Sequence, residues 1–452
     1  MQTNSQALLT DLYELTMAAT YFQEGMFEPA TFSLFIRDYP PDRGYFISAG
    51  LEEVLSYLES FEFRQEDLDY LKTTGLFSSE FLHYLHTLRF SGKVQAITEG
   101  RLFFKDEPVL EVTAPIIQAQ IVESFLINVI NLEVLLTTKA SRCVHAAQGR
   151  GLIDFSLRRT QGPDAGLRVA RCGYIAGMDG TSNVLAGKHY DIPVSGTMAH
   201  SFVTSFADEI DAFRAFANTF PQNTVLLIDT YDTLAGAEKA VQIAREMADQ
   251  GQQLRGVRLD SGNMSELSRQ VRSLFDREGF PEVRIFASGG FDEFKISDAI
   301  DQGALIDAFG VGTKMGVSAD APYSDIAYKL VKYAGHPVLK LSSGKKTLVD
   351  EKQVFRTYDP QGHPLRDTIA LRREDCEGEP LLQEVMVSGR RLFQPEPLQD
   401  IRDRCRLEVE QLGEAYKALR DPCIYPVELS PELQELQAEV VHEVRERELG
   451  ES

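Results

Sequence analysis

Hydrophobic and polar positions divide the chain into a central part and two flanks with a different pattern. Between about residue 138 and residue 325, short apolar runs alternate with longer amphipathic segments. This alternation is typical of strands and helices that build a parallel sheet. We predict an α/β barrel over residues 138–325, complete or incomplete, with its site at the C-terminal rim. A doubly wound open sheet is the alternative. The apolar runs are 151–155, 174–177, 193–194, 224–229, 256–260, 283–288 and 308–312.

The two flanks mix helical spacing with the strict alternation of strands. Apolar residues at helical spacing open the chain, alternation over 30–36 predicts a strand, and 116–136 predicts one long apolar helix. Alternation returns at 327–333 and 353–358. We therefore predict an N-terminal α+β domain over 1–137 and a β-rich segment over 326–397. This segment would return to the N-terminal domain and make it discontinuous. A charged helical C-terminal region would follow over 398–452.

The composition is that of an ordinary globular protein. Of the 452 residues, 43% are hydrophobic and 25% are charged, and no apolar run is long enough to span a bilayer. The N-terminus lacks the basic region of a secretory signal. The five cysteines are scattered without a Cys-x-x-Cys pair, which suggests neither a zinc ribbon nor a disulfide framework and fits a reducing cytoplasm. A net charge of −22 argues against nucleic-acid binding and requires that basic residues serving anionic substrates be concentrated locally.

The stretch from Ile192 to His200 combines a hydroxyl group and an imidazole at the end of an apolar run. Gly196 permits a tight turn, and we expect a helix to start here, with Thr197 and His200 about one turn apart on one face. Free N–H groups at a helix start favour an anion such as a phosphate. The alternative is a histidine that only satisfies local hydrogen bonds.

Charged side chains lie at or just after the ends of three further apolar runs. Arg158 and Arg159 could clamp a diphosphate or carboxylate, and alternation would put Arg158 on the same strand face as the preceding acidic residue, Asp154. Asp229 is a candidate for Mg²⁺ or ribose hydroxyls. Arg258 and Asp260 share one strand face, where a cation and a carboxylate can hold an anionic group and balance a developing positive charge.

Two consecutive strand ends are rich in glycine. They are Ala287-Ser-Gly-Gly290 and Phe309-Gly-Val-Gly-Thr313. In barrels, the last two strand–helix loops commonly cradle a phosphate with backbone N–H groups. Their succession after the Arg258 strand therefore predicts a phosphate site.

Together these motifs resemble the nicotinate phosphoribosyltransferase family. The resemblance covers most of the first 330 residues in the family's order. It is carried by residues 10–17, 157–164, 182–187, 196–202, 256–262 and 310–313. It implies a cytoplasmic enzyme of NAD salvage that joins nicotinate to 5-phosphoribosyl 1-diphosphate, with coupled ATP hydrolysis and expected Mg²⁺. It also implies a homodimer whose Tyr13 reaches the neighbouring subunit's site.

Site residues follow from the resemblance position by position. His200 resembles the histidine that ATP phosphorylates transiently, and Asp260 is a second candidate catalytic residue. The expected nicotinate contacts are Tyr13, Thr197 and Arg258. The expected phosphoribosyl-diphosphate contacts are Thr313, Gly312, Ser288, Gly289, Arg158 and Asp229. No metal ligands are assigned.

The residue types agree with such chemistry. A pyridine nitrogen already has a free lone pair, so its attack on the ribose carbon needs charge management rather than a strong base. Asp260 or Asp229 could offset oxocarbenium charge, while Mg²⁺ neutralises the leaving diphosphate. A neutral His200 can act as a nucleophile towards ATP.

Other readings of the sequence stay open. A nicotinamide phosphoribosyltransferase would need an acidic partner for the amide, and Asp154 is a candidate. A quinolinate phosphoribosyltransferase would need no such histidine. An isomerase or aldolase barrel would need a base or a Schiff-base lysine, for which Lys139, Lys188 and Lys314 are present without a clear motif. A non-catalytic nucleotide-binding barrel would keep the glycine loops but not the roles of His200 and Asp260.

Overall fold

The structure is a computed structural model that describes residues 6–341 and 347–450. The chain divides into two compact units. Unit 1 contains Met1–Leu135 and Tyr323–Ser452, and unit 2 contains Leu136–Pro322. The sequence led us to expect changes of domain at 137/138 and 325/326. None of the described helices is both long and apolar enough to cross a membrane.

Unit 2 is built on a six-stranded parallel sheet that curls into a half-barrel. Its order is β7-β6-β11-β10-β9-β8, and every neighbouring pair is parallel. An isolated parallel bridge from Thr181 to Val194 continues the sheet beyond β7. The strands are β6 (Gly151–Asp154), β7 (Gly180–Thr181), β8 (Val225–Leu227), β9 (Gly256–Leu259), β10 (Arg284–Phe291) and β11 (Ala308–Val311).

The strand order decides between the two predicted architectures. The first strand of the unit, β6, pairs with the last, β11, which is the closure of a barrel. A doubly wound sheet instead reverses its strand order in the middle. Among the described residues no ladder joins Val194 to β8, so the barrel is open there. The prediction of an α/β barrel-type sheet is confirmed in its incomplete form.

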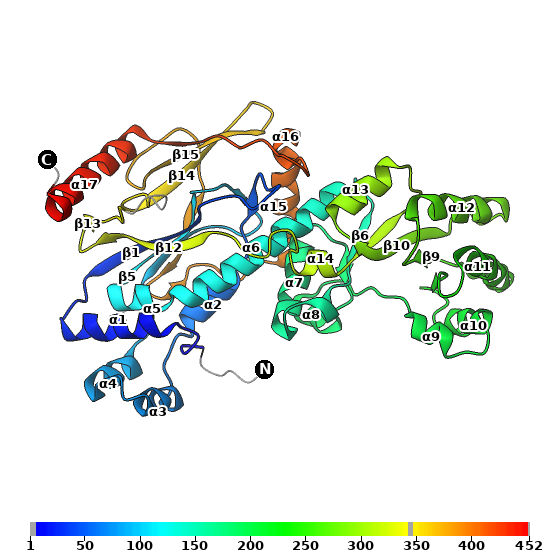
Figure 1. The fold of residues 1–452 in the computed structure, drawn as a ribbon, viewed down its shortest axis with the longest axis horizontal. Coiled ribbons are helices and arrows are strands. Elements are labelled where there is room, and N and C mark those ends of the chain that lie inside the picture. The colour runs from blue at the N-terminus through cyan, green and yellow to red at the C-terminus, as the bar shows by residue number, and fades with distance from the viewer. Residues whose placement is uncertain (1–5, 342–346, 451–452) are drawn as a thin grey trace. The chain divides into compact units, whose positions relative to one another are not determined.

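Helices follow the strands and cover the sheet, as Figure 1 shows for α11, α12 and α13. Four of them begin with an Asn or Asp side chain that accepts a backbone N–H of the first turn, namely Asn183, Asp232, Asn263 and Asp292. These caps start the helices directly after the strand ends, so the connecting loops stay short and lie at one edge of the sheet. The helices of unit 2 are α7 (Pro163–Ile175), α8 (Val184–Tyr190), α9 (His200–Thr204), α10 (Glu209–Thr219), α11 (Thr233–Asp249), α12 (Met264–Arg277), α13 (Glu293–Asp301) and α14 (Thr313–Gly316), with a 3-10 turn at Leu157–Arg159.

Unit 1 is an α+β unit in which segments from both flanks share one sheet. Its seven-stranded antiparallel sheet has the order β13-β12-β1-β5-β3-β17-β18, so strands from beyond residue 325 pair with N-terminal strands. Phe32 and Tyr328 stack across the β1–β12 pair with ring centroids 4.8 Å apart. The strands are β1 (Pro29–Ile36), β3 (Lys93–Ile97), β5 (Pro108–Pro115), β12 (Ile326–Tyr333), β13 (His336–Pro337), β17 (Leu382–Val387) and β18 (Arg390–Arg391).

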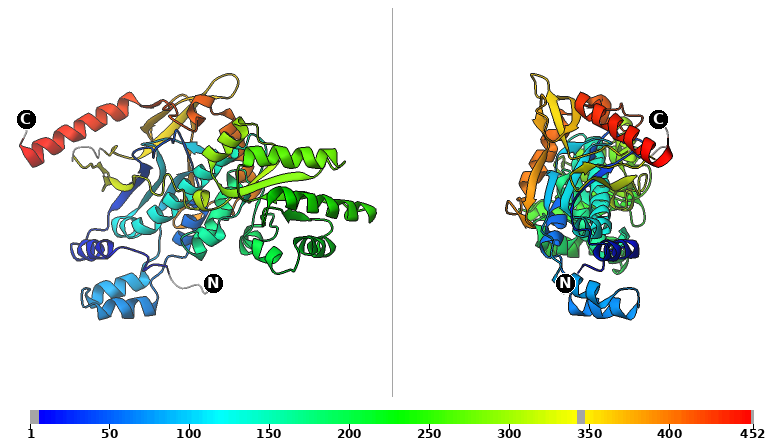
Figure 2. Two further views of the ribbon diagram at one scale, coloured as in Figure 1. Left: turned by 45° about the vertical axis from the view of Figure 1, so that its right-hand side comes forward. Right: turned by 90° about the vertical axis from the view of Figure 1, so that its left-hand side faces the viewer.

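The C-terminal region packs into unit 1 through buried charges and a terminal helix. Arg356 forms a fully buried ion pair with Asp367 at 2.6 Å and also reaches Glu408 at 3.1 Å. Because a buried charge is costly without its partner, these contacts fasten α15 to the sheets. Helix α17 packs against β15 (Figure 2). The remaining strands are β2 (Phe46–Ile47), β4 (Leu102–Phe103), β14 (Lys352–Tyr358), β15 (Pro364–Leu371), β16 (Glu379–Pro380) and β19 (Val427–Leu429). The helices are α1 (Leu12–Gln23), α2 (Leu51–Glu59), α3 (Gln65–Thr73), α4 (Ser79–Thr87), α5 (Ile116–Ile121), α15 (Leu398–Gln411), α16 (Glu414–Lys417) and α17 (Pro431–Leu449).

The single long helix predicted for 116–136 is wrong. The chain forms α5, breaks at Val122 and continues as α6 (Glu123–Ala146), whose residues from Leu136 onwards belong to unit 2. At the break, the buried carboxylate of Glu14 accepts the backbone N–H of Ser124 at 3.0 Å and the Ser124 hydroxyl at 2.6 Å. A side chain from α1 therefore caps the new helix, which apolar spacing alone could not reveal.

Candidate active site

Arg258 on β9 lies at the centre of a hydrogen-bonded cluster in unit 2. Its Nε donates to Ser288 Oγ at 2.9 Å, and its Nη1 donates to Thr197 Oγ1 at 2.9 Å and to the Met198 carbonyl at 3.1 Å. Its Nη2 donates to Asp260 Oδ1 at 3.2 Å. The guanidinium is therefore held rigidly, and Nη2 keeps a second N–H for a ligand.

A helix begins at the end of the predicted stretch, but the predicted helical face shared by Thr197 and His200 is wrong. Helix α9 begins at His200, and Thr197 lies before it in a segment without regular secondary structure. Arg258, on β9, donates hydrogen bonds to the Thr197 hydroxyl and to the Met198 carbonyl. These two bonds hold the segment against β9. Thr197 thus belongs to the cluster through Arg258 rather than through a shared helix face with His200.

His200 stands at the edge of the cluster between two polar partners. Its Nδ1 lies 3.1 Å from Thr230 Oγ1, and its Nε2 lies 3.8 Å from Asp260 Oδ2. The Thr230 hydroxyl donates to Nδ1 or accepts from it according to the tautomer of the ring. The ring side chain is 44% exposed, so a ligand can reach it.

Two carboxylates lie side by side past the ends of β8 and β9. Asp229 Oδ2 accepts the backbone N–H of Asp260 at 3.0 Å and the Ser261 hydroxyl at 2.6 Å. Burial acts to raise the pKa of Asp260, but the Ser288 hydroxyl and the charge of Arg258 outweigh it and hold that pKa below its usual value. Asp260 is therefore an anion at neutral pH.

The glycine-rich end of β10 approaches this cluster very closely. The register between β10 and β11 shifts between Ala287 and Phe291, so extra residues bulge out of the sheet. Gly289 has φ +97°, and a Cβ there would lie 1.9 Å from the carbonyl oxygen of Asp260. Only glycine fits this position. On the neighbouring strand, Gly312 precedes α14, and Thr313 is its exposed first residue.

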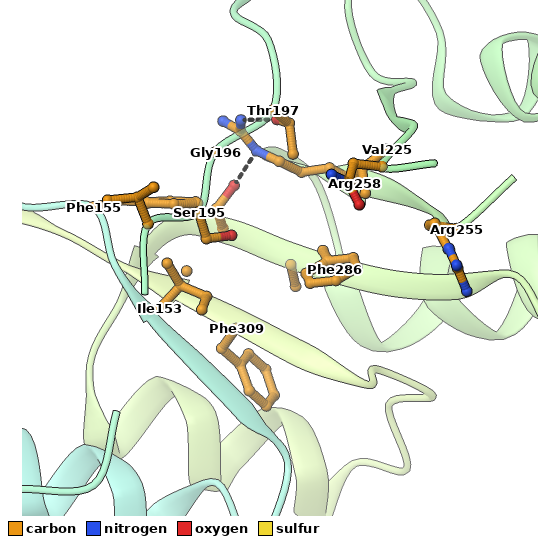
Figure 3. Close-up of a pocket in the computed structure, with 15 residues that line it drawn as sticks. Ile153, Phe155, Ser195, Gly196, Thr197, Val225, Arg255, Arg258, Phe286 and Phe309 are labelled. Carbon is orange, nitrogen blue, oxygen red and sulfur yellow. Dashed lines mark hydrogen bonds between the residues drawn. The ribbon is translucent and has the colours of Figure 1, made fainter. Parts of the chain in front are cut away.

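A cavity of about 380 Å³ lies inside the half-barrel next to the cluster (Figure 3). Thr197, Arg258 and Ser288 contribute to its wall, and Phe155, Phe286 and Phe309 supply its aromatic part. Arg258 also lies over the Phe155 ring, 5.7 Å from the centroid. This combination of apolar walls and a few convergent polar groups is typical of small-molecule sites. The lining residues are Ile153, Phe155, Val194, Ser195, Gly196, Thr197, Asn223, Val225, Arg255, Arg258, Phe286, Ala287, Ser288, Phe309 and Gly310.

Of two further residues predicted for the site, Arg158 lies outside the cluster and Tyr13 belongs to unit 1. Arg158 is exposed on the 3-10 turn, because β6 ends at Asp154, so the predicted common strand face of these two residues is wrong. The Asp154 carboxylate accepts the backbone N–H of Ser156 at 2.8 Å, which turns the chain at that point. Tyr13 belongs to α1 of unit 1 and is 46% exposed. Burial, and then the Glu123 carboxylate, raise its pKa.

Comparison with known proteins decides the family. The sequence matches the N-terminal domain of nicotinate phosphoribosyltransferase over residues 8–131, the family's central region over 151–361 and its C-terminal domain over 373–437. It is 46% identical to nicotinate phosphoribosyltransferase pncB2 of Mycobacterium tuberculosis, over 94% of this chain and 91% of that protein. The chain belongs to the nicotinate phosphoribosyltransferase family.

Other relatives agree. The nicotinate phosphoribosyltransferase of Bacillus subtilis is 36% identical over 98% of this chain and 97% of its own. The crystal structure of human nicotinic acid phosphoribosyltransferase superposes with a TM-score of 0.86 at 28% identity, covering 95% of this chain and 99% of that one. The nicotinate-nucleotide pyrophosphorylase of Pyrococcus furiosus shares the fold, with a TM-score of 0.74 at 24% identity over 90% of this chain and 95% of that one.

The geometry removes the residue on which the nicotinamide alternative rested. Asp154 is 1% exposed, and its carboxylate accepts the Ser156 hydroxyl at 2.5 Å and the Thr181 hydroxyl at 2.7 Å. Its neighbours Ile153 and Phe155 line the cavity instead, as alternation along a strand requires. In this member of the nicotinate phosphoribosyltransferase family, Asp154 is a structural carboxylate.

The sequence interpretation missed two residues of the site. Thr230, the partner of His200, directly follows Asp229, but a threonine after a strand carries no distinctive signal. Phe155, which lies beneath Arg258, was not among the predicted site residues. Alternation could have assigned Phe155 to the cavity once Asp154 was known to be buried on the other face.

Proposed function

We propose that the protein transfers the phosphoribosyl group of 5-phosphoribosyl 1-diphosphate to nicotinate, forming nicotinate mononucleotide and diphosphate for NAD salvage. We further propose that ATP hydrolysis is coupled to this transfer. The observation that carries the substrate assignment is Arg258, a cation held in the wall of a partly aromatic cavity inside the half-barrel. A guanidinium is the side chain best suited to a planar carboxylate.

Nicotinate would lie in the cavity with its carboxylate towards the second Nη2 N–H of Arg258 and the Thr197 hydroxyl. The rigid hydrogen bonds of Arg258 mean that little side-chain entropy is lost on binding. Phe155 offers a ring face for the pyridine. The bound acid would thus present its ring nitrogen at a fixed position, and that nitrogen needs no base because its lone pair is free.

Asp260 would balance the positive charge that develops on the ribose as the diphosphate departs. Its low pKa keeps it ionised, and its hydrogen bonds to Arg258 and Ser288 fix its position before the reaction. It lies 3.8 Å from His200. We propose that His200 attacks the terminal phosphate of ATP through an unprotonated ring nitrogen and displaces ADP, while the Thr230 hydroxyl and the Asp260 carboxylate orient the ring.

The carboxylates past β8 and β9 suit the expected Mg²⁺. Asp229 Oδ1 is buried and has no hydrogen-bond partner among the described residues, and an oxygen with free lone pairs is the donor that Mg²⁺ prefers. The described residues hold no group of three or more His, Cys, Asp or Glu arranged for a metal. Asp229, with Asp260 beside it, would therefore hold the ion together with substrate phosphate oxygens. Bound there, Mg²⁺ would neutralise the leaving diphosphate.

The remaining proposals concern the assembly and its place in the cell. We propose a cytoplasmic homodimer in which Tyr13 of one subunit completes the neighbouring subunit's site. The support is the family resemblance of residues 10–17 and the exposure of Tyr13 on α1.

The test is product formation by the purified protein with phosphoribosyl diphosphate and Mg²⁺. The acceptor is nicotinate or quinolinate, and each is tested with and without ATP. Nicotinate mononucleotide should form, faster with ATP and in step with release of ADP. Quinolinate should give no product. Product formation that ATP leaves unchanged would refute the coupling, and no product under any condition would refute the transfer.

A further inference from the structure

The cavity inside the half-barrel extends well beyond the cluster around Arg258. Asn223 and Arg255, which precede β8 and β9, line its other end, and both residues are exposed there. Phe286 lies between the two ends, because a Cβ added at Gly256 of β9 would meet its ring at 3.0 Å. A cavity of about 380 Å³ is in the range of sites for drug-sized molecules, so a single pyridine ring leaves part of it unfilled.

Arg255 brings a positive charge to this far end of the cavity. Its Nε donates to the Gln222 carbonyl at 3.1 Å, which orients the side chain. Among residues 6–341 and 347–450, neither of its two Nη groups has a hydrogen-bond or acidic partner, and the side-chain amide of Asn223 has none either. In a chain with a net charge of −22, an unpaired cation in a cavity wall favours an anionic ligand.

Arg255 and Arg258 are placed to bind the two ends of one elongated molecule. They are three residues apart, which separates their Cα atoms by about 10 Å along an extended chain. Figure 3 shows the Arg258 side chain extending away from Arg255, so the two charges lie at opposite ends of the cavity. Each guanidinium can bind a carboxylate, and the Phe286 ring between them can contact an aromatic body.

We propose that the cavity contains a second anion subsite at Arg255, and that it takes an elongated aromatic dicarboxylate with one carboxylate at each arginine. The aromatic body of this ligand lies along Phe286. Such a molecule occupies the position proposed for nicotinate and excludes nicotinate from the cavity. This competition rests on the proposed function, whereas binding of the dicarboxylate between the two arginines does not.

Calorimetry with two probes that differ by one carboxylate tests the subsite. Biphenyl-4,4′-dicarboxylate has an acid at each end, and biphenyl-4-carboxylate lacks one of them. Arg255→Gln removes the positive charge, and Arg255→Lys keeps it. Arg284→Gln is the matched control, because Arg284 is also exposed and begins the adjacent strand β10 at the same end of the sheet, but it does not line the cavity.

The wild type should bind the dicarboxylate roughly ten- to a hundredfold more tightly than the monocarboxylate, the value of one charge-assisted hydrogen bond. Arg255→Gln should lose this advantage without a change in the Kd of the monocarboxylate. Arg255→Lys and Arg284→Gln should keep it.

Three results would overturn the proposal. The first is equal Kd values for the two probes in the wild type, or no binding of the dicarboxylate. The second is an equal loss in Arg284→Gln. The third is weaker binding of the monocarboxylate in Arg255→Gln, which would trace the loss to a disturbed cavity. A dicarboxylate that binds as expected but does not compete with nicotinate would refute the proposed position of nicotinate and support the subsite.

Discussion

Two adjacent glycines at the end of β10 allow the contact with Asp260 to be tested against a matched control. Gly289 has φ +97°, and an added Cβ would meet the Asp260 carbonyl oxygen at 1.9 Å. Gly290 has φ +75°, but an added Cβ would have no heavy atom within 4 Å. Gly289→Ala and Gly290→Ala therefore share the backbone strain and differ in the clash.

The structure gives the magnitudes of both effects. A non-glycine residue with positive φ costs about 1 to 2 kcal/mol, so Gly290→Ala should destabilise unit 2 by about that amount. Gly289→Ala must also move backbone atoms apart, and we expect about 3 kcal/mol or more in total. Since the atom that moves belongs to Asp260, its carboxylate is displaced from Arg258 and Ser288. Loss of about 1.4 kcal/mol of transition-state stabilisation lowers kcat tenfold.

The assay compares the denaturant midpoint and kcat of the two variants with those of the wild type. Gly289→Ala should lose at least tenfold in kcat and more stability than Gly290→Ala, whose kcat should stay within about threefold of wild type. Equal losses in the two variants would refute the argument that the Gly289–Asp260 contact positions the carboxylate.

Three further predictions concern other parts of the molecule. His200→Ala should abolish ATP hydrolysis but leave a slow, ATP-independent transfer, and unaltered ATP hydrolysis would remove His200 from that step. Thr230→Val should lower ATP hydrolysis about tenfold, which is the value of a hydrogen bond of ordinary strength. Thr230→Ser should restore the rate, and the KM for nicotinate should change little. Unchanged ATP hydrolysis in Thr230→Val would contradict the role of Thr230 in orienting His200. Burial raises the pKa of Glu14 to about 7. Because the folded state then binds the proton more tightly than the unfolded state, this contribution to stability is fully present below pH 4.5 and is lost as the pH rises through 7. The Tm of Glu14→Gln should therefore rise relative to the wild-type Tm between pH 5 and pH 8. A Tm difference that does not change with pH would contradict the raised pKa of Glu14.

Periodicity sufficed for most strands of the central sheet and for one partner of Arg258, Asp260. It was wrong at 174–177, where α7 ends, and it missed β7. Apolar runs separated by helical segments indicate parallel strands, and a spacing of two placed Arg258 and Asp260 on one face, where they are hydrogen-bonded. Nothing in the pattern fixed whether the barrel closes. That depends on whether the segment at Val194 finds a partner strand, and a two-residue apolar run carries too little information.

The errors arose where tertiary contacts override local pattern. Thr197 stays outside α9 because Arg258, distant in sequence, holds its hydroxyl and the next carbonyl. The strand before Arg158 ends early because Asp154 accepts the N–H of Ser156. The break at Val122 depends on Glu14 from another helix. The roles assigned to the site residues remain predictions.

The most direct test of the account is the selectivity between nicotinate and nicotinamide, measured as kcat/KM in the wild type and in Arg258→Gln. These substrates differ only in the carboxylate that Arg258 is proposed to bind. We predict that the wild type strongly prefers nicotinate, and that the substitution reduces this preference by roughly ten- to a hundredfold. A wild type that prefers nicotinamide, or a preference for nicotinate that survives the substitution, would contradict the account.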